Sequence, residues 1–141
     1  MSDLQDMFQQ YLDMDTEERN NIAQEASNEI LSVFEQTFEG DSMFEAYLQM
    51  FSIFCSADGE LQYEEYELFT TITGTEVSYD DFFSAMQNEL ENTDIDEFFG
   101  FANDQGDDFM GSLIVLAICI FTCDGTLTVS EQEFIDEYFL A

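Results

Sequence analysis

Residues 107–123 read DDFMGSLIVLAICIFTC, and the segment from Leu113 to Phe121 is apolar on every side of a helix. A helix without a polar face is typically buried inside its protein. The apolar run is also far shorter than the roughly 20 residues that cross a bilayer. We therefore predict that this segment is the central helix of a bundle in a soluble protein.

Seven further helices are predicted around this one. The chain contains no proline, and its apolar residues recur at spacings of three and four between Gly, Asn and Asp breaks. The other helices are expected near residues 4–12, 16–40, 42–58, 66–72, 78–90, 93–102 and 128–139. Five of their starts are indicated by capping residues, namely Asp15, Ser42, Ser78, Thr93 and Thr128. With 141 residues, 45% of them hydrophobic, we expect one all-α domain over residues 1–141, a compact bundle of about seven to eight helices.

An internal repeat links two of these regions. After a shift of 66 residues, FSIFCSADGELQYEEYELF (51–69) aligns with AICIFTCDGTLTVSEQEFI (117–135). The alignment pairs an Asp-Gly step and, further on, a Glu in the two copies. It predicts two pseudo-repeated helix-loop-helix units, at about residues 43–73 and 109–140, in which Gly turns the backbone.

The repeat spacing also matches the second half of a calcium-binding EF-hand loop. That loop needs carboxylates at its first and third positions as well. Here those positions hold Phe54 and Ser56 in one copy, and Ile120 and Thr122 in the other. An ordinary EF-hand is therefore not expected.

The segments ADGELQYEEYELF (57–69) and CDGTLTVSEQEFI (123–135) resemble the paired signatures of the TerB-like tellurite-resistance fold. The resemblance covers roughly Phe44 to the C-terminus, although Gln62 stands where the family usually has Ser. It implies an all-helical domain with pseudo-repeated halves. It also implies a stress-response module that binds a divalent cation, such as calcium, through acidic residues. The matching positions in this chain are Asp58, Glu65, Asp124 and Glu131.

The charge of the chain is extreme. Against 33 Asp and Glu residues there is one basic residue, Arg19, and no Lys or His, so the formal net charge is -32. Self-repulsion on this scale destabilises a compact state, so the composition must serve something other than stability. Nucleic-acid phosphates and anionic lipids would both be repelled, which argues against direct binding to either.

The cysteines and the N-terminus bear on the cellular compartment. Cys55, Cys119 and Cys123 lie in apolar runs without metal-ligand spacing, which favours buried reduced thiols over disulfides or zinc. The N-terminal MSDLQDMF lacks the pattern of a signal peptide. We expect a cytoplasmic protein, in the cytoplasm of the host cell if a phage encodes the chain.

The sequence does not predict an enzyme. It offers no nucleophile paired with a base, no phosphate-binding glycine loop, and only Arg19 to stabilise a developing anion. Its composition instead resembles that of phage and plasmid inhibitors that mimic DNA. Because duplex DNA carries one charge per about 1.7 Å, the charge of -32 corresponds to roughly 50 Å of duplex, or about 16 base pairs.

We therefore predict a nucleic-acid mimic that occupies the basic DNA- or RNA-binding cleft of a host defence or DNA-binding protein, as anti-restriction and anti-CRISPR inhibitors do. The expected contacts are the densest acidic stretches, namely Glu89, Glu91, Asp94, Asp96, Glu97, Asp104, Asp107 and Asp108. Acidic residues at helix N-termini also interact favourably with the helix dipole, so a purely structural role stays open for them.

Three other interpretations of the whole protein stay open: the cation-binding stress module, a halophile surface, and an acidic adaptor for a basic protein that does not bind nucleic acid. The sequence leaves the oligomeric state undecided.

Overall fold

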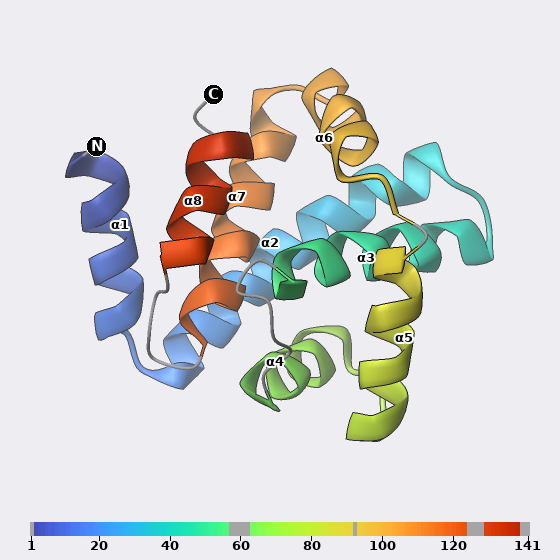
Figure 1. The fold of residues 1–141 in the computed structure, drawn as a ribbon, viewed down its shortest axis with the longest axis horizontal. Helices are drawn as coiled ribbons and strands as arrows, with labels where there is room; N and C mark the ends of the chain where they lie inside the picture. The colour runs from blue at the N-terminus through green and yellow to red at the C-terminus, as the bar shows by residue number, and fades with distance from the viewer. Residues whose placement is uncertain (1, 57–62, 92, 124–128, 139–141) are drawn as a thin grey trace.

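Helices make up all the regular structure described for this chain. A computed structural model describes residues 2–56, 63–91, 93–123 and 129–138. Over these ranges there are eight helices and no strand, which confirms the all-α prediction (Figure 1). The helices are α1 (Ser2–Asp13), α2 (Thr16–Thr37), α3 (Asp41–Cys55), α4 (Tyr63–Thr73), α5 (Tyr79–Glu91), α6 (Ile95–Asp104), α7 (Asp107–Thr122) and α8 (Val129–Tyr138).

Helix α7 is the central helix, as its apolar sequence predicts. Every residue from Leu116 to Thr122 is buried. The helix contacts α1, α2, α3 and α6, and the ring of Phe121 lies 5.9 Å from that of Phe134 on α8 (Figure 1). Among the helices described, none is both long enough and apolar enough to span a membrane.

Helices α2 and α7 run antiparallel and share the most extensive helix contact in the fold. At one end, the Arg19 guanidinium donates a hydrogen bond to the carbonyl oxygen of Thr122. At the other end, the ring of Phe34 on α2 lies 6.0 Å from that of Phe109 on α7. Because the two contacts join the start of each helix to the end of the other, the pair forms a long two-helix surface.

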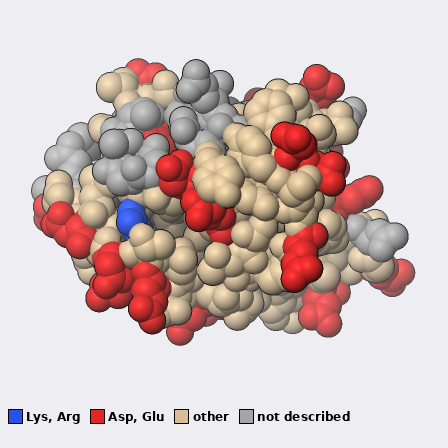
Figure 2. All heavy atoms as spheres, turned by 90° about the horizontal axis from the view of Figure 1, so that it is seen from below, with Lys and Arg blue, Asp and Glu red and all other residues tan. Residues whose placement is uncertain are grey.

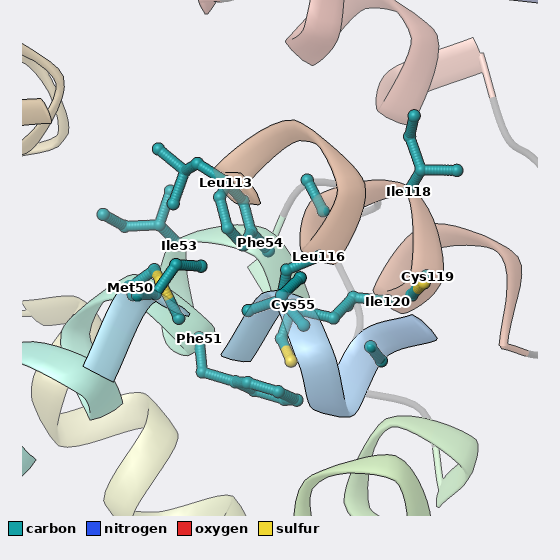
Figure 3. Close-up of a cluster of buried hydrophobic side chains, with 14 of the residues drawn as sticks. Met50, Phe51, Ile53, Phe54, Cys55, Leu113, Leu116, Ile118, Cys119 and Ile120 are labelled. Atoms are coloured by element: carbon teal, nitrogen blue, oxygen red, sulfur yellow. The ribbon is translucent and has the colours of Figure 1, made fainter. Parts of the chain in front are cut away.

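The core is dense in phenylalanine. Side chains of α3, including Ile53 and Phe54, meet those of α7, including Leu113 and Leu116, in its centre (Figure 3). The phenylalanines that are less than 2% exposed are Phe34, Phe51, Phe54, Phe69, Phe82 and Phe121. Since burying one such side chain contributes about 1.5–3 kcal/mol, this core supplies the stabilisation that opposes the self-repulsion of the surface.

Two of the predicted helix caps are present. The Asp15 carboxylate accepts the Glu18 N–H at 2.8 Å and opens α2. The Ser78 hydroxyl oxygen accepts the Asp81 N–H at 3.2 Å and opens α5. In both cases the side chain satisfies a donor that the first helical turn leaves unpaired.

Two further caps were predicted at the wrong residue, and the fifth, at Thr128, lies outside the described residues. Helix α3 begins at Asp41, so Ser42 lies inside the helix and Gly40 is the N-cap, at a φ of 57° that favours glycine. Helix α6 is capped by Asp94, whose carboxylate accepts the Glu97 N–H at 3.1 Å. Thr93 does not cap α6 because its hydroxyl donates to the carbonyl oxygen of Glu89 in the preceding helix.

The two predicted repeat units show matching helix starts. Helices α4 and α8 begin 66 residues apart, and each has a buried glutamate, Glu65 or Glu131, as its third residue. The loops at 57–62 and 124–128 lie outside the described residues. The repeat and the TerB-like fold therefore stay predictions.

Candidate functional site

The predicted contact residues follow one continuous stretch of chain. Glu89 and Glu91 end α5, Asp94 caps α6, Asp96 and Glu97 lie in its first turn and Asp104 ends it, while Asp107 and Asp108 begin α7. All are exposed except Glu89, which is half-buried. Several also stabilise their own helices, because negative charge near an N-terminus interacts favourably with the helix dipole.

A groove of about 870 Å³ lies between α2 and α7, and we call it the α2–α7 groove. Its acidic rim consists of Glu25, Glu29, Asp107 and Asp108. Its apolar floor consists of Ile22, Ala26, Val33, Phe109 and Val115, and Tyr11 of α1 also contributes to the lining. The lining residues recur at spacings of three and four along each helix, so each helix presents one continuous face to the groove.

The groove joins predicted residues to residues that the sequence analysis missed. Asp107 and Asp108 were expected contacts, whereas Glu25 and Glu29 come from a helix some 80 positions earlier and were not singled out. The hydroxyl of Ser112 donates a hydrogen bond to the Glu29 carboxylate, which orients that side chain on the rim. Glu25 and Glu29 are one helical turn apart, and like charges at this spacing destabilise a helix. Stability of α2 therefore does not explain the pair.

Arg19, the only basic residue of the chain, is 9% exposed. Its guanidinium bonds the Thr122 carbonyl oxygen, and its Nε atom is buried without a hydrogen-bond partner. Over the residues that the structure describes, it makes no ion pair with a carboxylate. On the face of the molecule below the view of Figure 1, acidic groups spread widely around one small basic spot (Figure 2). The charged side chains at the surface are therefore almost all negative.

Replacing Arg19 with Ala should lower the free energy of unfolding by about 2 kcal/mol, because the buried carbonyl of Thr122 loses a charged donor. Urea unfolding followed by circular dichroism measures the change. Asn20→Ala, at the next and half-exposed position of α2, is the matched control and should have little effect. Equal stability of Arg19→Ala and the wild type would show that this contact is energetically neutral.

Two buried groups, a thiol and a phenol, have pKa values above their usual range. Burial raises the pKa of the Cys119 thiol to about 12, although the nearby Arg19 charge acts in the opposite direction. Burial also raises the pKa of Tyr47 to about 12, and the side-chain hydrogen bond with Ser27, 2.8 Å long, only partly opposes this. A thiol with so high a pKa is protonated at neutral pH, so Cys119 does not provide a nucleophile.

The predicted cation site is only partly covered by the structure. Glu65 and Glu131 are 3% and 4% exposed, whereas Asp58 and Asp124 lie outside the described residues. Within the described part of the chain, no group of three or more Cys, Asp and Glu side chains is arranged to hold a metal ion. The calcium prediction therefore depends on the residues at 58 and 124.

Comparison with models of protein families, with curated proteins and with solved structures finds no match to this chain. The resemblance to TerB-like proteins stays a prediction that rests on the two Asp-Gly motifs.

Proposed function

We propose that this protein imitates nucleic acid and occupies the basic DNA- or RNA-binding cleft of another protein. The observation that carries the proposal is the uniform sign of the surface charge. The chain has a net charge of -32, and its only basic side chain, Arg19, is buried against α7. A cleft built to hold phosphates would meet carboxylates on every approach. No exposed Lys or Arg side chain would repel it locally.

Binding would draw on the same physics as nucleic-acid recognition. A negative field steers a basic partner toward the surface, and association rates in such systems reach about 10⁸–10⁹ M⁻¹s⁻¹ at low salt. Helices fix the carboxylates in place, so less conformational entropy is lost when Lys and Arg side chains pair with them. The proposed surface includes the rim of the α2–α7 groove and the carboxylates from Glu89, at the end of α5, to Asp104, at the end of α6.

Competition against nucleic acid tests the proposal. A labelled duplex of about 16 base pairs, which matches the charge of the chain, is bound to a basic nuclease, repressor or nucleoid protein and titrated with this protein. We expect displacement at 0.15 M salt that weakens as salt rises. If the duplex stays bound to every protein of such a panel, the proposal is wrong, and retention of a basic protein that binds no nucleic acid would support the adaptor interpretation instead.

Paired neutralisation locates the contact surface. Glu25→Gln with Glu29→Gln should weaken displacement by about tenfold, because two rim charges are lost. Asp80→Asn with Asp81→Asn removes the same charge from the exposed start of α5 and serves as the matched control. Equal weakening by the two pairs would mean that total charge, and not this surface, governs binding.

A divalent-cation module is the second candidate, and the burial of Glu65 and Glu131 at matching positions of α4 and α8 favours it. Calorimetric titration with calcium in 0.15 M salt would then show a saturable site. Replacing Asp58 and Asp124 together with Asn should abolish that site. If the wild type and the double variant release the same heat on calcium addition, the heat reflects counterion condensation, and this candidate is excluded.

A further inference from the structure

The floor of the α2–α7 groove is apolar, which imitation of a phosphate backbone does not require. Ile22, Val33 and Val115 are half-buried, and Phe109 lies beneath them with 4% exposure. Apolar surface in a hollow gains free energy when a partner's apolar side chains cover it. The groove therefore fits a protein segment better than it fits any purely ionic surface.

The dimensions of the groove suit a helix. Its α2 wall extends from Ile22 to Val33, which is about 16 Å at 1.5 Å per residue, or three helical turns. The groove lies between two antiparallel helices, with Tyr11 of α1 as a further lining residue, and an amphipathic helix commonly docks in such a groove by its apolar face. A volume of about 870 Å³ accommodates several large side chains.

The charge of the rim selects the occupant. Four carboxylates, from Glu25, Glu29, Asp107 and Asp108, border the apolar floor. A second copy of this chain would bring its own charge of -32 and would be repelled. A segment with Lys or Arg on both sides of an apolar stripe would satisfy the rim and the floor together.

We propose that the α2–α7 groove binds a basic amphipathic helix of the partner protein, with its apolar side chains on the floor and its Lys and Arg side chains on the rim. The inference rests on the proposed function and names the part of the partner that is held.

Gly111 offers a way to block the groove without disturbing the core. It lies on the groove-facing side of α7, and a Cβ atom built on it has no neighbour within 4 Å. Gly111→Phe should therefore project a ring into the groove. Gly100 on α6 is also helical, exposed and free of neighbours at its Cβ position, so Gly100→Phe is the matched control.

The test uses an 18-residue peptide of Lys and Leu with one Trp on its apolar face. Because the protein has no Trp, the emission comes from the peptide alone, and a blue shift reports entry into the apolar floor. We expect saturable binding with a blue shift, a Kd about tenfold higher with Gly111→Phe, and no change with Gly100→Phe. A peptide of identical composition but scrambled order should bind more weakly and without the shift.

Two results would overturn the inference. One is equal binding of the ordered and scrambled peptides, and the other is an unchanged Kd with Gly111→Phe while circular dichroism shows a folded variant. If Gly111→Phe does not fold, the Glu25→Gln and Glu29→Gln pair replaces it, and unchanged affinity and salt dependence for the ordered peptide would then overturn the inference.

The competition assay separates this inference from the proposed function. If the wild type and Gly111→Phe displace the duplex equally well, the mimicry proposal stands and the groove inference is wrong. If the ordered peptide binds the groove but no duplex is displaced from any nucleic-acid-binding protein, the groove inference stands and the mimicry proposal is wrong.

Discussion

Raising the pH above 9 should destabilise the protein progressively, with a loss of roughly 5 kcal/mol as the pH approaches 12. Two buried groups cause most of the loss, and Tyr11, whose pKa is also raised by burial, adds to it. Burial raises the pKa of Cys119 from 9.0 to about 12 and that of Tyr47 from 10.0 to about 12.

The direction follows from proton binding. Below pH 9, both the folded and the unfolded chains hold these protons, so stability does not depend on them. As the pH rises, the unfolded chain releases the protons first, because the folded pKa values are the higher ones. The unfolded state is then favoured until the pH also exceeds the folded pKa values.

Single substitutions identify the group responsible. Cys119→Ala should shift the alkaline unfolding midpoint upward, as measured by circular dichroism in a pH titration. Cys123→Ala, four residues later at the C-cap of α7 and half-buried, is the control for loss of a thiol. If Cys119→Ala unfolds at the same pH as the wild type, burial of this thiol is not the cause.

Raising NaCl from 0.01 M to 0.15 M should increase the Tm by roughly 10 °C. The Debye length falls from about 30 Å to about 8 Å over this range, so repulsion among the 33 carboxylates is screened across most of the molecule. Differential scanning calorimetry at fixed pH measures the shift. A Tm that does not change with salt would mean that the Phe-rich core leaves stability insensitive to surface charge.

The same measurement separates three interpretations of the acidic surface. A general screening effect should level off once the Debye length is shorter than the spacing between carboxylates, and KCl should act as NaCl does. A stability that keeps rising into molar salt would favour the halophile surface. A calcium effect that saturates at low concentration and exceeds that of magnesium would favour the cation-binding module.

Local patterns predicted much of the fold. The apolar run from Leu113 to Phe121 predicted a buried central helix because no orientation of that helix could expose a polar face. Asp15 capped α2 as predicted, because its carboxylate pairs with an N–H only three residues later in the chain. Thr93 failed as a cap because its neighbour Asp94 could serve equally well. The choice between them depended on the bond that the Thr93 hydroxyl donates to Glu89 in the preceding helix.

The candidate site was only half predictable. Acidic density along the chain identified Asp107 and Asp108, but Glu25 and Glu29 join them only because α2 packs antiparallel to α7. That pairing is a tertiary contact which the spacing within either helix does not encode. The burial of Arg19 was missed for the same reason, since its partner, Thr122, is 103 positions away.

The position of Arg19 also bears on how the chain is degraded. Trypsin-like proteases cleave after Lys or Arg, and the whole sequence holds one such bond, between Arg19 and Asn20. That bond lies in the first turns of α2, and the side chain that the protease must recognise is held against the end of α7. Cleavage therefore requires the start of α2 to separate from α7, so the folded protein should resist such proteases for as long as these two helices stay together.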